Sequence, residues 1–243
     1  MAKLEIELVP CLKDNYAYLV YDRTEGVCGV VDASESEPVK RALESRGLKL
    51  THILSTHHHP DHVGGNLALK QAFGVQVVGA AKDSARIPGI DVGVNEGDIF
   101  RLGSHAARVL EIPAHTSQHI AFWFEADKAV FTGDTLFAMG CGRLFEGSPD
   151  QMHHSLGRLA GLPAKMKLYC AHEYTLANAR FAAHAFPENK EIADRLRHIQ
   201  RERSLARPTV PTTVGEEQAT NPFLLARDVE HFADLRAKKD NFQ

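Results

Sequence analysis

Residues 56–62, with the sequence THHHPDH, constrain this chain more than any other stretch, because they concentrate imidazole and carboxylate groups in one short segment. The segment follows a buried-strand pattern at 53–55 and precedes the flexible pair Gly64 and Gly65. Alternate residues of an extended chain share a face, and imidazole and carboxylate both bind zinc and similar divalent ions. The alternative is a solvated histidine-rich loop, but packing does not explain so dense a pattern. The stretch therefore predicts a metal site with His58 outside the ligand set. The expected ligands here are His57, His59, Asp61 and His62.

The composition around this segment is that of an ordinary globular protein. Of 243 residues, 44% are hydrophobic, and 28 basic side chains nearly balance 31 acidic ones. This balance predicts neither nucleic-acid nor membrane partners. Residues 1–8 alternate charged with apolar side chains, unlike a signal peptide, and the four cysteines show no Cys-x-x-Cys spacing. Free thiols suit a reducing compartment, so we expect a cytoplasmic protein.

The pattern of strands and helices changes character near residue 172. Before it, period-two alternation predicts strands interspersed with helices; beyond it, only helical patterns remain, and Thr213 and Glu216 have the spacing of a capping box. Segment 80–103 is predicted as a loop with short turns. We expect a β-rich catalytic domain at 1–172 and a helical substrate-binding domain at 173–243. The predicted strands are 4–9, 16–21, 27–31, 51–55, 75–78, 108–112, 120–124, 129–131 and 167–170, and the predicted helices are 36–46, 66–73, 150–159, 175–186, 189–206 and 228–237.

Three further strand ends carry candidate ligands, namely His115, Asp134 and His172. Loops at strand ends are common places for functional residues. The seven candidates are too many for one tetrahedral ion but suffice for two, with Asp134 as a shared, bridging carboxylate. Two ions roughly 3.5 to 4 Å apart lower the pKa of a water between them to about 7. One ion is assigned His57, His59 and His115, and the other is assigned Asp61, His62 and His172.

Motifs along nearly the whole chain resemble the metallo-β-lactamase superfamily, and more narrowly the glyoxalase II enzymes, or hydroxyacylglutathione hydrolases. The metal motif 56–62 and the later TGD at 132–134 are typical of the superfamily. The last helix, with Arg236 and Lys239, is what distinguishes the narrower family. The narrower resemblance rests on DTLF at 134–137, CGRLFEG at 141–147, AHEYT at 171–175, NPFL at 221–224 and RAKKD at 236–240.

This resemblance implies an α+β fold, an αββα sandwich with a C-terminal helical domain. It implies hydrolysis of S-D-lactoylglutathione and other S-2-hydroxyacylglutathiones to glutathione and a 2-hydroxy acid such as D-lactate, the second step of methylglyoxal detoxification. Asp61 and Asp134 are the expected catalytic residues. Two divalent ions are expected, with zinc first and iron or manganese also compatible with these ligands. We expect a monomer that acts on a small molecule.

The same resemblance assigns five residues to glutathione: Arg143, Phe145, Tyr174, Arg236 and Lys239. A guanidinium binds a carboxylate through two parallel hydrogen bonds, and an ammonium adds a point charge. Residues three apart in a helix are neighbours on one face. The alternative for the last two is an ordinary basic helix terminus, favoured by the macrodipole.

Three positions depart from the family pattern. Phe145 stands where many relatives have tyrosine, which removes a hydroxyl contact of about 0.5 to 1.5 kcal/mol. Ala114 and Gln118 stand where relatives carry glycine, and Gln118 would be strained if the turn needed a left-handed backbone. Two more residues have alternative assignments: Asp32 either orients a ligand histidine or merely forms a turn, and His119 is assigned to structure rather than to the metal.

Other functions of the same fold are the main alternatives, namely a lactonase, a persulfide dioxygenase with one iron, or a secreted β-lactamase. The terminal basic pair and the complete ligand set disfavour the first two, and the absence of an export signal disfavours the third. A binding module with a structural metal is a further alternative. Such sites are usually rich in cysteine, and none of the cysteines belongs to the cluster.

Overall fold

The structure is a computed structural model that describes residues 3–242. Its internal contacts divide the chain into two compact units. The first unit comprises Met1–Glu111 and Gln118–Gly133, and the second comprises Ile112–Ser117 and Asp134–Gln243. Within the described residues, no helix has the length and apolar character needed to cross a membrane. Each unit is described separately.

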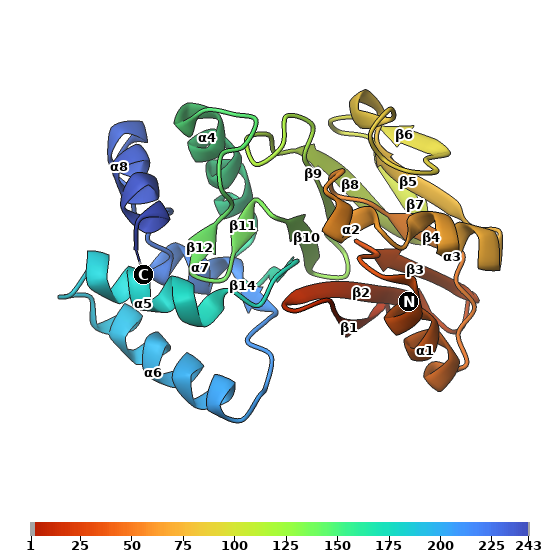
Figure 1. Ribbon diagram of the computed structural model, residues 1–243, viewed down its shortest axis with the longest axis horizontal. Helices are drawn as coiled ribbons and strands as arrows, with labels where there is room; N and C mark the ends of the chain where they lie inside the picture. The colour runs from red at the N-terminus through yellow and green to blue at the C-terminus, as the bar shows by residue number, and fades with distance from the viewer. Residues whose placement is uncertain (1–2, 243) are drawn as a thin grey trace. The chain divides into compact units, whose positions relative to one another are not determined.

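The first unit contains a six-stranded sheet in the order β1-β2-β3-β4-β5-β6. The first three strands are antiparallel and the last three continue the sheet in parallel. Parallel neighbours need crossover connections. Helix α1 connects β3 to β4, the segment containing α3 connects β4 to β5, and residues 81–91 connect β5 to β6 (Figure 1). The strands are β1 (Glu5–Cys11), β2 (Asn15–Asp22), β3 (Val27–Val31), β4 (His52–Leu54), β5 (Gln76–Ala80) and β6 (Val92–Val94), and the helices are α1 (Ser36–Arg46) and α3 (Asn66–Phe73).

A second, antiparallel set of strands in this unit has the order β10-β9-β8-β7. It faces the first sheet, because Tyr18 of β2 contacts Phe131 of β10 at a ring-centroid distance of 5.6 Å. The alternate residues Ala17 and Leu19 instead belong to the apolar cluster that includes Val39 and Leu43 of α1. Strand β2 is therefore buried on both faces, which explains its unbroken apolar character. The four strands are β7 (Ile99–Leu102), β8 (His105–Glu111), β9 (Ile120–Phe124) and β10 (Ala129–Gly133).

The first unit differs from the sequence prediction mainly in short elements. Segment 80–103, predicted as a loop, contains the 3-10 turn η1 (Ala81–Asp83) as well as β6 and β7. The ligand-bearing segment contains one helical turn, α2 (Pro60–Val63), which was not predicted. The longer predicted strands and the helices at 36–46 and 66–73 are confirmed. Gly47 ends α1 in the left-handed region, as its C-terminal position predicts.

The second unit is largely helical. Its helices α5 and α6 lie side by side, and Met139 inserts into their apolar cluster (Figure 1). The prediction of no strand beyond residue 174 is wrong, because β14 pairs with β13. The capping box of Thr213 and Glu216 is confirmed at the start of α7. The elements are β11 (Leu136–Phe137), β12 (Gly140–Cys141), α4 (Pro149–Ala160), β13 (Lys167–Cys170), α5 (Thr175–Ala185), α6 (Lys190–Ser204), β14 (Thr212–Thr213), α7 (Val214–Thr220) and α8 (Val229–Asp240).

The domain boundary expected at residue 172 remains a prediction. The two units divide the chain by internal contacts, and they assign the short segment Ile112–Ser117 to the second unit.

All four cysteines are free and buried. Burial raises the pKa of the Cys28 thiol to about 12, that of Cys141 to about 11 and that of Cys170 to about 12. Burial also raises the pKa of Cys11. Since the thiolate is the nucleophilic form, these side chains behave as small apolar groups rather than as reactive thiols.

A buried histidine joins the two sheets of the first unit. His105, at the start of β8, lies with Nε2 3.1 Å from Asp22 and Nδ1 3.0 Å from Asp127. Burial lowers the pKa of His105, but hydrogen bonds to the two carboxylates outweigh it, so the pKa is raised overall. Hydrogen bonds from Thr24, then from His105, lower the pKa of Asp22 to about 2. His105 therefore bridges the Asp22 and Asp127 carboxylates, and both contacts favour its protonated form.

We expect the substitution His105→Gln to lower the melting temperature most at mildly acidic pH. A histidine whose pKa is higher in the folded than in the unfolded state contributes its full stabilisation below the unfolded-state pKa of about 6.5. This contribution is lost as the pH rises through the folded-state pKa. Thermal unfolding should show a deficit on the order of 2 to 4 °C at about pH 5.5 that shrinks at higher pH. The control His52→Gln should show the opposite trend, because burial lowers the pKa of His52. A deficit in melting temperature that does not depend on pH would contradict the raised pKa of His105.

Candidate metal centre

In the first unit, the Asp32 carboxylate organises the ligand-bearing segment. It accepts hydrogen bonds from Thr56 N and Thr56 Oγ1, both at 2.8 Å, and lies 3.1 Å from His62 Nδ1. Asp32 follows β3 with a φ of 52°, in the left-handed region that costs a non-glycine residue about 1 kcal/mol or more. Its carboxylate is thereby brought to the loop after β4. The prediction that Asp32 orients a ligand histidine is consistent with this contact.

The hydrogen bonds to Thr56 define which nitrogen of His57 carries a proton. Thr56 has one hydroxyl hydrogen, and it is donated to Asp32. Thr56 Oγ1 lies 3.0 Å from His57 Nδ1 and must therefore accept a hydrogen bond from it. His57 Nε2 then presents its lone pair. Such a partner on the second nitrogen is typical of metal-binding histidines.

Donor atoms in the same segment have the spacing of neighbouring metal ligands. His57 Nε2 lies 3.2 Å from His59 Nδ1, and His62 Nε2 lies 3.5 Å from Asp61 Oδ2. Bonds of 2.0 to 2.1 Å to a tetrahedral ion separate two ligand atoms by roughly 3.3 Å. Asn15 Nδ2 donates to Asp61 Oδ2 at 3.0 Å and so restrains this carboxylate. The four predicted ligands of this segment thus form two pairs that each fit one ion.

The second unit brings the other three predicted ligands together. Asp134 Oδ2 lies 3.4 Å from His115 Nε2 and 3.3 Å from His172 Nε2. His115 Nδ1 lies 3.0 Å from the carbonyl oxygen of Arg143, to which it must donate, so its Nε2 carries the lone pair. One carboxylate oxygen therefore lies between two histidine nitrogens at ligand spacing. This arrangement fits the predicted bridging role of Asp134, and both donor sets fit divalent metal ions.

Close backbone packing supports His115. Ala114 has a φ of 135°, so the left-handed strain expected in this turn falls on Ala114 and not on Gln118. A Cβ on Gly142 would collide with the Asp134 carbonyl oxygen, and one on Gly147 would collide with Ala114. The two glycines of the 141–147 segment are therefore required by close approach rather than by flexibility.

Two of the predicted substrate-binding residues present aromatic surface next to these ligands. The Tyr174 ring stacks on His172 with a centroid distance of 4.6 Å. Phe145 meets the edge of His115 at 5.2 Å and is 61% exposed. An exposed aromatic side chain beside a ligand histidine offers apolar contact to a bound molecule.

The three predicted basic residues occupy different environments. Arg236 is only 6% exposed, stacks on Phe223, and donates to the Cys141 carbonyl oxygen at 3.0 Å and to Asp240 at 2.7 Å. Burial, then the nearby Arg236 charge, lowers the pKa of Lys239. The Arg143 side chain is 67% exposed. The cations accessible to an anionic ligand are thus Lys239 and Arg143, while Arg236 is committed to internal contacts.

Apart from Asp32, sequence reasoning missed the residues that support the predicted ligands. His58, expected not to be a ligand, instead lies with Nδ1 3.0 Å from the buried carboxylate of Asp83. Thr56 and Asn15 were not singled out either. His119 stacks on His57 with a centroid distance of 4.5 Å, a packing role that agrees with its assignment to structure. No periodic signal marks such partners, because Thr56 acts through its tertiary contact with Asp32 and Asn15 comes from β2.

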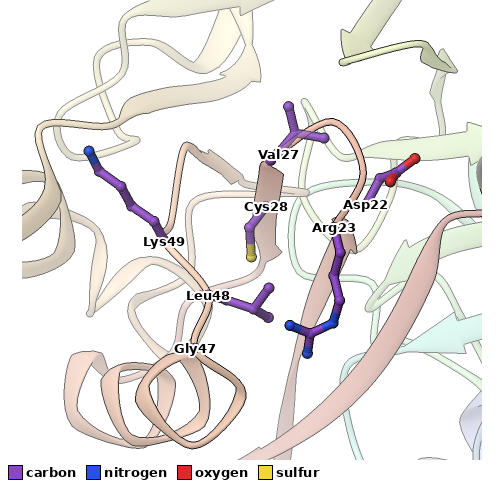
Figure 2. A pocket seen from close by; sticks show the side chains of 8 residues that line it. Asp22, Arg23, Val27, Cys28, Gly47, Leu48 and Lys49 are labelled. Carbon is purple, nitrogen blue, oxygen red and sulfur yellow. The ribbon is translucent and has the colours of Figure 1, made fainter.

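Two cavities lie away from the predicted ligands. One of about 220 Å³ in the first unit is lined by residues of the β2–β3 turn and of the segment after α1, among them Arg23, Cys28 and Leu48 (Figure 2). It is at the start of β3, whereas Asp32 follows the end of that strand. Another of about 360 Å³, in the second unit, is lined by α6 and residues 208–212. Neither includes a predicted ligand.

Comparisons with known proteins cover the whole chain. The model of the metallo-beta-lactamase superfamily matches residues 13–172, and the model of the hydroxyacylglutathione hydrolase C-terminus matches residues 173–242. A Methylococcus capsulatus protein named hydroxyacylglutathione hydrolase is 52% identical over 99% of both chains. Further relatives of that name are 44% to 49% identical.

Solved structures share the fold. The crystal structure of ETHE1 from Myxococcus xanthus has a TM-score of 0.72 and 27% identity, and covers 96% of this chain and 90% of its own. That of TTHA1623 in a di-iron-bound form has a TM-score of 0.65 and 25% identity, over 89% of this chain and 98% of its own. The expected fold class, an α+β αββα sandwich with a C-terminal helical region, is confirmed.

We expect Thr56→Val to weaken metal binding without unfolding the protein. The change removes the hydroxyl that connects His57 to Asp32 but keeps the side-chain shape. Loss of such an outer partner typically costs about 10- to 100-fold in metal affinity. Competition with a chromophoric chelator measures the metal affinity.

The matched control is Thr51→Val in the same unit. The Thr51 hydroxyl is also hydrogen-bonded, to the backbone N–H and carbonyl oxygen of Cys28, but it is not connected to the predicted ligands. Equal losses of affinity in both variants would contradict the role assigned to Thr56.

Proposed function

Because this chain belongs to the hydroxyacylglutathione hydrolase family of the metallo-β-lactamase superfamily, we propose that it hydrolyses S-D-lactoylglutathione and related S-2-hydroxyacylglutathiones. Water cleaves the C–S bond of the thioester, and the products are glutathione and a 2-hydroxy acid such as D-lactate. The geometric observation that supports this activity best is Asp134 Oδ2, placed 3.3 to 3.4 Å from two histidine nitrogens.

The proposed metal ligands are the seven side chains predicted from the sequence. The set around His57, His59 and His115 would hold one ion, the set around Asp61, His62 and His172 would hold the other, and Asp134 would contribute to both. Zinc is the proposed metal, since imidazole and carboxylate oxygen are common zinc ligands. Bound divalent ions supply an activated water nucleophile and stabilise negative charge on the thioester oxygen and on the leaving sulfur.

The chain itself orients these ligands and keeps them unprotonated on the metal-binding side. Asp32 accepts from His62 Nδ1, Thr56 accepts from His57 Nδ1, and the Arg143 carbonyl accepts from His115 Nδ1. Asp61, restrained by Asn15, and Asp134 are the proposed catalytic residues, since a carboxylate beside the nucleophilic water accepts a hydrogen bond from it and orients it.

The glutathione portion would be bound by Arg143, Phe145, Tyr174 and Lys239. The two cations attract its carboxylates, and the two exposed aromatic rings contact its carbon chain. Arg236, predicted for the same purpose, supports this surface from beneath through its bond to the Cys141 carbonyl oxygen. We propose that residues 1–172 carry the chemistry and that 173–243 complete substrate binding.

The proposed setting is a monomeric protein of the cytoplasm. Four free, buried cysteines are typical of a reducing compartment. The lactonase, one-iron dioxygenase and β-lactamase alternatives explain less of the chain, because none of them accounts for the glutathione hydrolase match over 173–242.

We expect Asp134→Ala to lose thioester hydrolysis by at least about 100-fold in kcat/KM, since a ligand contributes more than the outer partners that typically cost 10- to 100-fold. Loss of absorbance from S-D-lactoylglutathione measures the rate. A simple thioester without glutathione should react far more slowly with the unmodified protein. Chelation should abolish activity and zinc should restore it. An Asp134→Ala protein with full activity would overturn the proposed site.

We expect Lys239→Met to raise KM roughly tenfold with little change in kcat, because one charge-assisted contact to substrate is lost. Methionine keeps an unbranched side chain of similar size, while the change also removes the contacts of the ammonium with the Phe181 and Phe242 rings. The matched control is Lys238→Met on the same helix, whose ammonium pairs with Asp234. An unchanged KM for Lys239→Met, or an equal rise in both variants, would exclude Lys239 from substrate binding.

A further inference from the structure

Glu217 of α7 is a fully buried carboxylate that the predicted chemistry does not use. Its Oε1 accepts from Thr212 Oγ1 at 2.7 Å and from Arg195 Nη2. Its Oε2 accepts from the backbone N–H of Met139 at 2.7 Å and from Asn221 Nδ2 at 3.0 Å. Four donors therefore converge on one side chain from three separate segments of the second unit.

Only an ionised carboxylate satisfies all four of these donors. A glutamine at this position would turn an N–H group toward Arg195 and Thr212, or toward Met139 and Asn221. The charge of Arg195 offsets the cost of burying the Glu217 anion, but burying such a pair is rarely a net gain in stability. A buried ion pair attached to a backbone N–H therefore indicates that the position of that backbone matters.

The backbone held in this way is the turn of the β11–β12 hairpin. Met139 has a φ of 56°, a left-handed conformation that is unfavourable for a side chain of this type. Asn221 Nδ2 also contacts the carbonyl oxygens of Phe137 and Gly140, at 3.1 and 3.0 Å. Asn178 Nδ2 donates to the Ala138 carbonyl at 3.2 Å. Every residue of the turn from 137 to 140 is thus bound by a side chain of α5, α7 or the α7 C-cap.

Both ends of this hairpin lead to the candidate metal centre. Asp134 lies two residues before β11, and Gly142 N donates to the Thr135 carbonyl oxygen at 3.1 Å. Arg143 follows, and its carbonyl oxygen orients His115. A shift of the hairpin would therefore move the bridging carboxylate and the hydrogen-bond acceptor of His115 together.

We propose that Glu217, together with Asn221, is a positioning residue that holds the 134–143 segment in its metal-binding geometry. The inference rests on the proposed ligand roles of Asp134 and His115. It extends the site from the ligands to the helical C-terminal region, which then serves metal binding as well as substrate binding.

The test is Glu217→Gln, measured by chelator competition on the folded protein. We expect metal affinity at least about tenfold weaker, with a lower kcat. Glu216→Gln is the matched control, because Glu216 is the neighbouring carboxylate and does not contact the hairpin. Its side chain accepts a hydrogen bond from the backbone N–H of Thr213, the N-cap residue of α7. Thr213→Ala controls for stability, since it weakens the same helix at its N-cap by about 1 kcal/mol. Both controls should retain the metal affinity of the unmodified protein.

Should Glu217→Gln not fold, Asn221→Ala decides the matter, because it releases the carbonyl oxygens of Phe137 and Gly140 while leaving the Arg195–Glu217 pair in place. Weaker metal binding in it supports the proposal. Unchanged metal affinity in a folded Glu217→Gln or Asn221→Ala protein overturns it, and so does an equal loss in Thr213→Ala. Chelator competition needs no thioester, so a protein that binds metal but leaves S-D-lactoylglutathione intact would refute the proposed function alone.

Discussion

A neutral imidazole has one lone pair to give to a cation, and the rest of this site depends on fixing which nitrogen carries it. In His57, His62 and His115, a hydrogen bond from Nδ1 leaves the lone pair on Nε2. The acceptors are, in order, Thr56 Oγ1, the Asp32 carboxylate and the Arg143 carbonyl oxygen. Asp32 is central, because it accepts from both His62 and the hydroxyl that accepts from His57. The left-handed backbone at Asp32 is the structural cost of placing one carboxylate against both Thr56 and His62 in the 56–62 segment.

Candidate ligands could be proposed from sequence because metal-binding side chain types at strand ends form short, local patterns. The group at 57–62 is continuous in the chain, and each remaining candidate lies shortly after a predicted strand. Of their partners, Asp32 alone was named from the sequence, with orienting a ligand histidine as one of two alternatives. Asp32 and Thr56 are 24 residues apart, and no periodicity connects them. Strands β6, β7 and β14 were missed for a related reason, since pairing rather than residue type defines strands of two to four residues.

Helical spacing predicted which residues share a face but not how deeply that face is buried. Arg236 and Lys239 are three apart and looked equivalent as glutathione ligands. In the structure Arg236 is enclosed between Phe223, Cys141 and Asp240, whereas Lys239 is only half-buried. The same holds for Glu217, which is one residue beyond an exposed capping glutamate and yet fully buried. Depth is a property of the tertiary fold, so position in a motif does not reveal it.

The burial of all four cysteines bears on the product that this protein is proposed to release. Glutathione disulfide, the oxidised form of that product, forms mixed disulfides with protein thiols when a protein thiolate attacks it and displaces glutathione. A thiol with a pKa of about 11 or 12, as at Cys28, Cys141 and Cys170, has almost no thiolate at neutral pH. Cys141 immediately precedes the residues that orient His115, so its modification would disturb the metal ligands. Enclosing it protects the protein from S-glutathionylation by the disulfide form of the compound that it would generate.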